Sequence, residues 1–229
     1  MCPPLSVVAL YIPEYIFVYD SIWSAAMLFH RSLNEVFRSW THVAVLRVLR
    51  DTTVGFTGNQ VAREARMHPR SAFKALTALE MLGMIRRQRG GRDHLFTLNR
   101  DHILLVEGVL PLLDVERLMI DRLEAELRPL LQRKVVTAIL FGSVARKEET
   151  PGSDLDLCCI VDGEKKTTVV QNALHTSAPH FYRSFGVKIA PIFLTGTEFL
   201  RKSGTPLMRA ILSEGRIIVG RIPRPTKHA

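Results

Sequence analysis

The sequence is poor in cysteine, and its three cysteines do not suit a disulfide framework. They are Cys2 and the adjacent pair Cys158 and Cys159, and neighbouring residues of a strand point to opposite faces. Because no Cys-x-x-Cys or His-Glu-x-x-His spacing accompanies them, the sequence predicts no thiolate metal site. We interpret the pair as small core residues, and the lack of disulfides favours a reducing, cytoplasmic location.

Long apolar runs are also missing. The most apolar stretch, residues 5–19, is interrupted by Pro13 and Glu14 and falls short of the roughly 20 apolar residues that a membrane span needs. It lacks the basic start of a signal peptide, so the sequence predicts no membrane role. Helical periodicity begins only near Leu33, and Met27 offers an internal start. The residues before Met27 are therefore a hypothetical non-native extension, which the intact mass of the native protein tests.

Acidic residues are outnumbered by basic ones. The chain has 22 Asp and Glu against 31 Lys and Arg, a formal net charge of +9 and a pI near 9.9. This balance favours a polyanionic partner such as nucleic acid. A hydrophobic fraction of 47% with 23% charged residues excludes wholesale disorder. A length of 229 residues corresponds to one large domain or two small ones.

Apolar periodicity predicts three helices in the N-terminal half of the chain. The first, straight or bent, is expected over 33–49, and a short one over 59–65 has Thr57 as its N-cap. The third is expected over 69–82, because proline suits a first helical turn and Gly83 suits the stop. We expect the third helix to bury Ala72, Phe73, Leu76 and Leu79.

Two short strands, 84–89 and 92–98, follow with a Gly-Gly pair between them and predict a hairpin. Three helices and a basic hairpin in this order resemble a winged helix-turn-helix over about 33–100. The run Leu-Glu-Met-Leu-Gly-Met-Ile at 79–85 matches that family's transition from recognition helix to wing. The resemblance implies a mainly helical domain that binds double-stranded DNA.

Basic residues concentrate in the same region. Residues 60–100 carry nine Lys and Arg against three acids, as expected of a surface that faces phosphates. The N-terminal end of a recognition helix approaches the bases, and the wing approaches the backbone. The alternative is a solvated face of a protein-interaction module, including one that forms a homodimer. The predicted DNA contacts are His68, Arg70, Ser71, Lys74, Arg86, Arg87, Arg89 and Arg92.

Residues 101–134 predict a second helical region. We expect a break at Pro111 and a later helix from about Asp114, which Pro129 bends or ends. Its charges are mixed in sign beside an apolar stripe, which is typical of a solvated helix face. We interpret the region as a connector packed on the C-terminal domain.

The pattern that carries chemistry lies beyond this connector. Residues 135–141 predict a buried strand followed by a turn at Gly142 and Ser143, and a second strand begins at Asp154. Side chains two positions apart share a strand face, so Asp154 and Asp156 project together. Such a pair is stable mainly with a cation between the carboxylates, and hard oxygen ligands select Mg²⁺ or Mn²⁺. Glycine permits close backbone approach, and the serine hydroxyl with nearby N–H groups binds phosphate oxygens.

The stretch 142–157, Gly-Ser-Val-Ala-Arg followed by Gly-Ser-Asp-Leu-Asp-Leu, resembles the signature of the DNA polymerase beta-like nucleotidyltransferase superfamily, especially its minimal nucleotidyltransferase branch. The resemblance runs over about 115–220 and implies an α/β (α+β) fold with a small mixed sheet. It also implies that bound metal neutralises a nucleoside triphosphate and aligns an acceptor hydroxyl. The implied catalytic metal ligands are Asp154 and Asp156, and the implied nucleotide-binding residues are Gly142, Ser143, Arg146 and Ser153.

Active members of that superfamily supply a third carboxylate from a later strand. Here the strand is predicted over 186–194, which contains no acid and carries Lys188 about where one is expected. Glu198 and Asp162 are the remaining candidates, both expected in loops. Arg146 has an equal alternative as a surface arginine paired with a nearby glutamate, Glu148 or Glu149.

Two functions are therefore in competition. The first is a cytoplasmic nucleotidyltransferase that binds Mg²⁺ and a triphosphate and transfers a nucleotidyl group to an unidentified acceptor hydroxyl. The second is a transcription regulator or antitoxin-like DNA binder whose degenerate transferase domain only senses nucleotide. The expected organisation is an extension at 1–32, a winged helix-turn-helix domain at 33–100, a connector at 101–134, a nucleotidyltransferase domain at 135–220 and a basic tail at 221–229.

Overall fold

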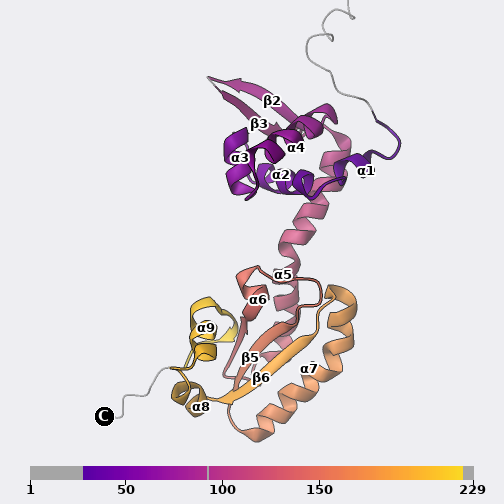
Figure 1. Cartoon of the computed structure of the whole chain (residues 1–229). Helices are drawn as coiled ribbons and strands as arrows, with labels where there is room; N and C mark the ends of the chain where they lie inside the picture. The colour runs from indigo at the N-terminus through magenta and orange to yellow at the C-terminus, as the bar shows by residue number, and fades with distance from the viewer. Residues whose placement is uncertain (1–27, 92, 224–229) are drawn as a thin grey trace, which may run out of the picture. The chain divides into compact units, whose positions relative to one another are not determined.

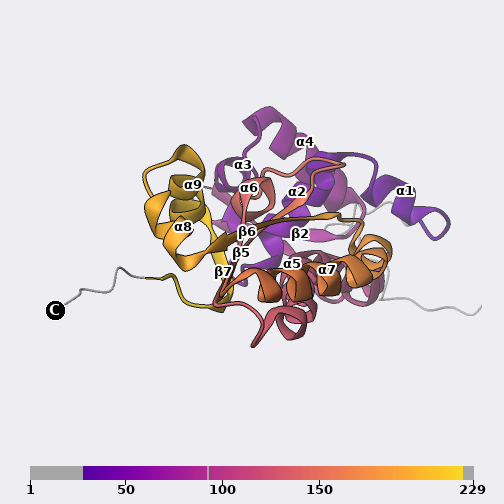
Figure 2. The same ribbon diagram turned by 90° about the horizontal axis from the view of Figure 1, so that it is seen from below.

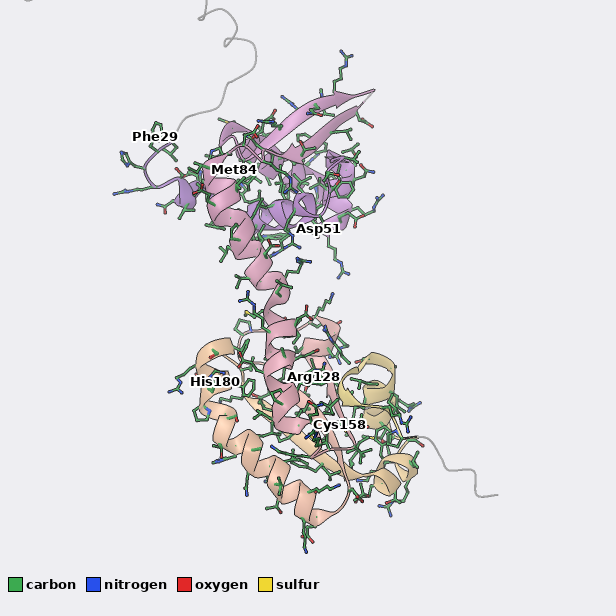
Figure 3. The ribbon with its side chains drawn as sticks, turned by 180° about the vertical axis from the view of Figure 1, so that it is seen from behind. Phe29, Asp51, Met84, Arg128, Cys158 and His180 are labelled. Carbon is green, nitrogen blue, oxygen red and sulfur yellow. The ribbon has the colours of Figure 1, made fainter. Side chains whose placement is uncertain are left out.

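The computed structural model describes residues 28–91 and 93–223, shown in Figure 1. The chain divides into two compact units, Met1–Asp114 and Val115–Ala229, and this boundary falls within the predicted connector. Each unit has its own core: Met84 is buried in the first and Cys158 in the second (Figure 3). The hypothetical extension before Met27, the predicted DNA contact Arg92 and the tail from residue 224 lie outside the described residues.

The first unit opens with two helices where one was expected. They are α1 (Ser32–Val36) and α2 (Trp40–Arg50). Ser39 separates them: its backbone is extended, and its hydroxyl accepts a hydrogen bond from the Thr41 N–H at 3.3 Å. The expectation of one helix is wrong because this capping contact begins a new helix there. The buried side chains are Val36, His42, Val45, Leu46 and Leu49, whereas Leu33 and Trp40 are exposed.

Helices α3 (Gly58–Glu64) and α4 (Pro69–Met81) confirm the next two predictions. Thr57 caps α3 as predicted: its hydroxyl accepts from the Gln60 N–H, and the Gln60 side chain accepts from the Thr57 N–H at 2.8 Å. This reciprocal pair is a capping box. Gly83 follows α4 with a φ of +72°, which favours glycine at a helix stop.

The predicted buried face of α4 is wrong at one position. Phe73 is 45% exposed, and Ala75 is buried in its place. A Cβ added at Gly58 would lie only 2.4 Å from the Phe73 ring, so the ring lies over the start of α3 at the edge of the core. Periodicity identifies the face of a helix, but a large ring at its border covers a neighbour and stays partly exposed.

Three strands complete the first unit: β1 (Phe56–Thr57), β2 (Ile85–Gly90) and β3 (Asp93–Leu98). They form an antiparallel sheet in the order β1-β3-β2. Gly90 pairs with Asp93, so Gly90 belongs to β2 and the hairpin loop is not the expected Gly-Gly pair. Buried apolar residues of both strands must face one core, and this requirement sets the register.

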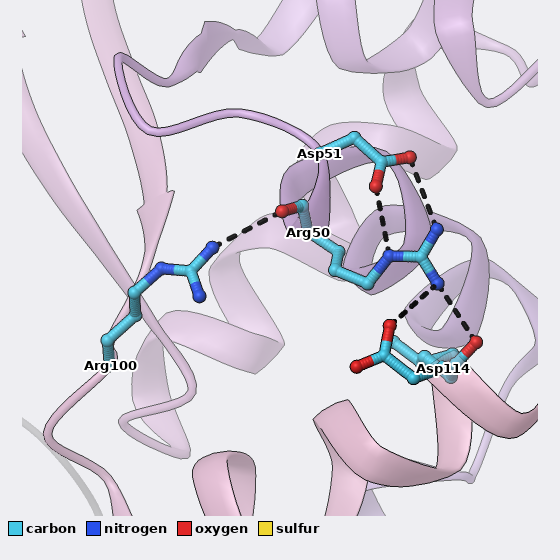
Figure 4. A network of polar contacts seen from close by, with 5 residues as sticks. Arg50, Asp51, Arg100 and Asp114 are labelled. Atoms are coloured by element: carbon cyan, nitrogen blue, oxygen red, sulfur yellow. Dashed lines mark hydrogen bonds and ion pairs between the residues drawn. The ribbon is translucent and has the colours of Figure 1, made fainter.

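Arg50 joins the end of α2 to the end of the first unit (Figure 4). Its Nη1 donates to the Leu113 carbonyl at 2.9 Å, and its Nε donates to Asp51 Oδ1 at 3.0 Å. The carboxylate of Asp114 lies 3.9 Å from Nη1. Arg100 Nη2 donates to the Arg50 carbonyl at 3.2 Å, so one arginine connects three segments of this unit.

The expected helix break at Pro111 is wrong. A π-helical turn, η1 (Leu104–Val109), runs directly into α5 (Leu110–Leu131). In a regular α-helix a proline ring clashes with the carbonyl four residues earlier, and the wider π turn before Pro111 changes the position of that carbonyl. Pro129 also lies inside α5, close to its end. No helix in the described ranges has both the length and the apolar character to cross a bilayer.

The sheet of the second unit is small and mixed, as predicted. It contains β4 (Thr137–Phe141), β5 (Leu155–Val161), β6 (Ile189–Thr195) and β7 (Arg216–Gly220) in the order β6-β5-β4-β7. The strands β5 and β6 are parallel, and the other two pairs are antiparallel. The crossover between the parallel strands is α7 (Glu164–Phe185), as parallel strands require.

Helices cover both faces of this sheet. The apolar stripes of α5 and α7 pack on the face that carries Cys159, and Figure 2 shows these two helices on one side of the strands. The face that carries Cys158 is covered by α8 (Gly196–Arg201) and α9 (Pro206–Glu214). Both cysteines are buried, and burial raises the pKa of the Cys158 thiol to about 11 and that of Cys159 to about 12. Neither thiol is a nucleophile at neutral pH.

Candidate nucleotide and metal site

The site begins where β4 ends. Gly142 starts a short helix, α6 (Gly142–Arg146), where the sequence predicted a turn. It has a φ of +76°, and a Cβ added to it would lie 2.0 Å from Asp156 Oδ2. The Asp156 carboxylate is therefore packed directly on the glycine backbone, and only glycine allows both the conformation and this approach.

The two predicted carboxylates lie at the N-terminal end of β5. Leu155 and Leu157 are fully buried in the core shared with α5 and α7, so by alternation Asp154 and Asp156 project from the other face. Partial burial raises the pKa of Asp156, the nearby Asp154 charge raises it further, and Arg146 lowers it. Because the folded state holds this proton more strongly than the unfolded chain, stability falls as pH rises from the ordinary aspartate range through the raised pKa.

Arg146 is held between two glutamates. Its Nε donates to Glu148 at 2.8 Å and its Nη1 donates to Glu214 at 2.9 Å. Glu148 was one of the two alternatives predicted from the sequence. Glu214 was missed, because it comes from the end of α9 and no local pattern links it to Arg146. Negative charge therefore exceeds positive charge among these site residues.

The two serines occupy different environments. Ser143 lies half-buried in the first turn of α6, where no side chain caps the helix. Ser153 holds the loop before β5, because its hydroxyl accepts from the Thr150 N–H at 3.0 Å. Its backbone N–H donates in turn to the Thr150 carbonyl at 2.9 Å. The hydroxyl of Ser153 is therefore engaged within its own loop.

A third carboxylate is absent from the expected strand. The register pairs Ala190 of β6 with Asp156 of β5, so a small apolar side chain lies beside the aspartate pair. Lys188 precedes β6, and its carbonyl accepts from the Leu155 N–H at 2.8 Å. The position adjacent to Asp156 is therefore Ala190.

The two other candidate acids do not reach the site. Asp162 follows the opposite end of β5 and pairs with Lys166 at 3.5 Å. Glu198 lies in α8, beyond the matching end of β6 and not in the expected loop, and it accepts from the Thr195 N–H at 2.8 Å. This contact lowers the pKa of Glu198 and keeps it ionised as a helix cap. Among the described residues, no group of three or more His, Cys, Asp or Glu side chains is placed to hold a metal ion.

The donor set fits one hard cation rather than two. Mg²⁺ is commonly bound through one or two carboxylates, with water and substrate phosphates completing its coordination. Asp154 and Asp156 supply that number of carboxylates, and the Asp156 carboxylate is fixed against Gly142. With Ala190 at the third position, a second ion lacks a bridging ligand from β6.

The packing at Gly142 yields a direct test. Gly142→Ala is expected to displace the Asp156 carboxylate and to weaken Mn²⁺ binding at least about tenfold, which corresponds to roughly 1.4 kcal/mol. Gly152→Ala is the matched control, because Gly152 has a φ of +93° but no heavy atom within 4 Å of an added Cβ. Calorimetric titration of both variants with Mn²⁺ separates the steric effect from backbone strain, and equal weakening would contradict the assigned packing.

The predicted DNA contacts that the structure describes lie on α4, at its N-cap and on β2. His68 caps α4, where its Nδ1 accepts from the Arg70 N–H at 3.2 Å, and Ser71 and Lys74 follow on the same helix. Two arginines of β2 have acidic partners: Arg86 pairs with Asp101, and Arg87 lies 3.1 Å from Glu80. Arg89 is exposed and has no ion-pair partner within the described part of the chain.

The second unit contains a match to a known domain family. Residues 120–212 match the family model of the nucleotidyltransferase domain, and this range contains Gly142, Ser143, Asp154 and Asp156. No curated protein matches the chain significantly. A solved toxin-antitoxin structure with AMP-PNP is 20% identical with a TM-score of 0.31, and a mutant of the toxin-antitoxin MntA-HpeT is 18% identical with the same score. Each match covers 43% of this chain and 73% of the other.

Proposed function

We propose that the second unit binds a nucleoside triphosphate with Mg²⁺ and transfers a nucleotidyl group to an acceptor hydroxyl. The observation that carries the proposal is the Asp156 carboxylate packed on Gly142, with Asp154 on the same strand face. This contact joins the predicted phosphate-binding turn to the predicted metal ligands. Titration of the full chain with a nonhydrolysable triphosphate and Mn²⁺ tests binding, and transfer of radiolabel from a triphosphate tests the reaction.

Each residue has a defined task in this proposal. Ser143 donates its hydroxyl to a phosphate oxygen at the start of α6. Arg146 keeps Nη2 for a charge-assisted contact to phosphate, because Glu148 and Glu214 engage its other nitrogens. Asp154 and Asp156 hold the metal. When bound, the ion neutralises the phosphates and stabilises the leaving pyrophosphate.

A specific observation favours a second function for the same site. Ala190 beside Asp156 leaves no carboxylate on β6 to take the proton from an acceptor hydroxyl. In the alternative, this unit binds the triphosphate without efficient turnover and serves as a nucleotide sensor for a regulator. The two functions share the binding step and differ in the transfer of label.

For the first unit we propose a winged helix-turn-helix that binds double-stranded DNA. The support is the sequence of α2, α3 and α4 followed by an antiparallel hairpin, with basic residues on both α4 and β2. In this arrangement Arg70, Ser71 and Lys74 approach base edges, whereas Arg87 and Arg89 approach phosphates.

Removing the charge of Arg86, Arg87 and Arg89 together is expected to weaken binding to duplexes of any sequence and to flatten its salt dependence. The log–log slope falls by up to about 0.9 for each phosphate that the protein no longer neutralises. Because Arg86 and Arg87 have acidic partners, Arg89→Gln alone is expected to give the largest single change. Fluorescence anisotropy across a salt titration measures the slope.

The matched control for this experiment is Lys165→Gln, which removes a positive charge from α7 in the other unit. Arg70→Gln or Lys74→Gln changes sequence preference where these side chains reach base edges. An unchanged affinity and slope in the triple variant would favour a protein-interaction module instead.

A further inference from the structure

The first unit contains a cavity whose buried histidine and apolar wall have no role in the proposed functions. It has a volume of about 710 Å³ and is lined by residues of α1, α2 and α4 together with Leu28 and Ser39. This volume lies within the roughly 300–1,000 Å³ range that small-molecule sites occupy. Ligand sites combine apolar walls with a few placed polar groups, and this cavity has both.

The most buried polar group in the lining is His42, which is 7% exposed. Its Nδ1 lies 3.0 Å from the Glu35 carbonyl oxygen, and because a carbonyl only accepts, Nδ1 is the donor. The neutral ring therefore has its acceptor at Nε2. No hydrogen bond from a described residue reaches that nitrogen, so a hydroxyl or N–H of a ligand is its natural partner.

The charges in the lining do not cancel. Arg38 lies 3.3 Å from Glu35, and these two neutralise each other. Lys74 is exposed at the rim and has no ion-pair partner among residues 28–91 and 93–223. One positive charge remains, and it suits one negative charge on a ligand.

The remaining wall is apolar. Ala75 and Ala78 of α4 contribute it together with Leu82, which directly follows the helix, and the two alanines leave room for a flat body against the helix. We propose that this cavity binds a small amphipathic monoanion, with an aromatic or aliphatic body on the alanine wall and a carboxylate or sulfonate at Lys74. A hydrogen-bond donor on the same ligand meets Nε2 of His42.

The cavity also has a consequence for DNA, which rests on the proposed DNA-binding function. Ser71 and Lys74 line the cavity and are also predicted DNA contacts. A monoanion at Lys74 competes with nucleic acid for the same charge, so the ligand is expected to weaken DNA binding. The cavity would then act as an effector site beside the recognition helix.

The test uses 1-anilinonaphthalene-8-sulfonate, a fluorescent aromatic monoanion with an N–H donor, and the full chain. Ala78→Phe fills the cavity and is expected to weaken saturable binding of this probe at least about tenfold. Thr77→Phe is the matched control, because Thr77 is exposed on the same helix and outside the lining; it is expected to bind the probe as the wild type does. Melting temperatures report whether both variants fold.

If Ala78→Phe does not fold, a second pair of variants still tests probe binding in the cavity. Lys74→Gln is expected to weaken probe binding several-fold, and Arg70→Gln on the same helix is expected to leave it unchanged. Equal probe affinity across these variants, or many weak sites in place of one saturable site, would overturn the proposed cavity ligand.

Measuring duplex DNA affinity in the presence of the probe separates ligand binding in the cavity from its competition with DNA. Saturating probe is expected to weaken duplex binding by the wild type and by Thr77→Phe, but not by Ala78→Phe. If the probe binds as expected and duplex affinity stays the same, the monoanion site stands and its competition with DNA is overturned. If no duplex binds at all, the proposed DNA function fails while the probe titration still decides the site.

Discussion

Replacing Asp154 and Asp156 together with asparagine is expected to abolish Mn²⁺-dependent triphosphate binding and to leave the fold intact or slightly more stable. Binding disappears because the other two candidate acids, Asp162 and Glu198, lie beyond the opposite strand ends. Stability is retained because each carboxylate repels the other, and burial with this repulsion raises the pKa of Asp156. Asparagine has nearly the same shape as aspartate but no charge, so it removes both the repulsion and the cost of burying a charged group.

Calorimetry with a nonhydrolysable triphosphate and Mn²⁺ measures the first effect, and thermal unfolding measures the second. Asp162→Asn is the matched control, since it removes a carboxylate that follows the other end of β5, away from the site. Undiminished metal-dependent binding by the double variant would falsify the site assignment. A collapse of the fold would show that the aspartates have structural partners.

The excess of negative charge at the site makes triphosphate binding depend on a divalent ion. Arg146 is accompanied by four acids: Asp154, Asp156, Glu148 and Glu214. A triphosphate that approaches without a divalent ion is therefore repelled. We expect the wild type to lose triphosphate binding in the presence of a chelator and to recover it when Mg²⁺ or Mn²⁺ is restored.

The second large effect is expected from Ala190→Asp, which places an acid beside Asp156 in the observed register. The wild type is expected to bind triphosphate with slow or undetectable transfer, because β6 offers no carboxylate to take the proton from the acceptor. General-base assistance contributes about 10² to 10⁴ in rate. A gain of this size in labelling would identify Ala190 as the position that limits turnover.

Radiolabelled triphosphate incubated with protein and lysate reports both self-labelling and acceptor labelling. Lys188→Asp is the comparison variant, because Lys188 lies before β6 and is not paired with Asp156. Lys188→Asp is expected to increase the labelling rate less than Ala190→Asp does. Robust labelling by the wild type that disappears in Asp154→Asn would refute the argument from the missing acid and leave the sensor as the weaker function.

Local sequence patterns predicted the parts of the structure that short-range forces control. Thr57 caps α3 as predicted, through contacts with a residue three positions away, and Pro69 begins α4 as its position implied. The alternation Asp-Leu-Asp-Leu in 154–157 predicted a polar strand face and a buried one without knowledge of the strand pairing. These predictions succeed because turns, caps and strand alternation depend on residues close together in the sequence.

Other predictions failed where competing contacts decided the outcome. The helix expected over 33–49 is interrupted because the Ser39 hydroxyl caps a new one. Pro111 does not break its helix because a π turn precedes it. Phe73 is exposed because its ring covers Gly58. Each sequence pattern reflects a local conformational preference, and packing or capping contacts then favoured a different local structure.

The sequence by itself determined the Gly-Ser and Asp-x-Asp residues of the site and, through the resemblance that they carry, a small mixed sheet. Only the tertiary structure decided that Glu214 holds Arg146, that Ala190 is the neighbour of Asp156, and that residues of α1, α2 and α4 line an open cavity with His42 in its wall. The physical reason is the range of the interactions. Propensity and periodicity act over a few residues, whereas strand register and helix packing join residues that are distant in the chain and follow from burying whole faces together.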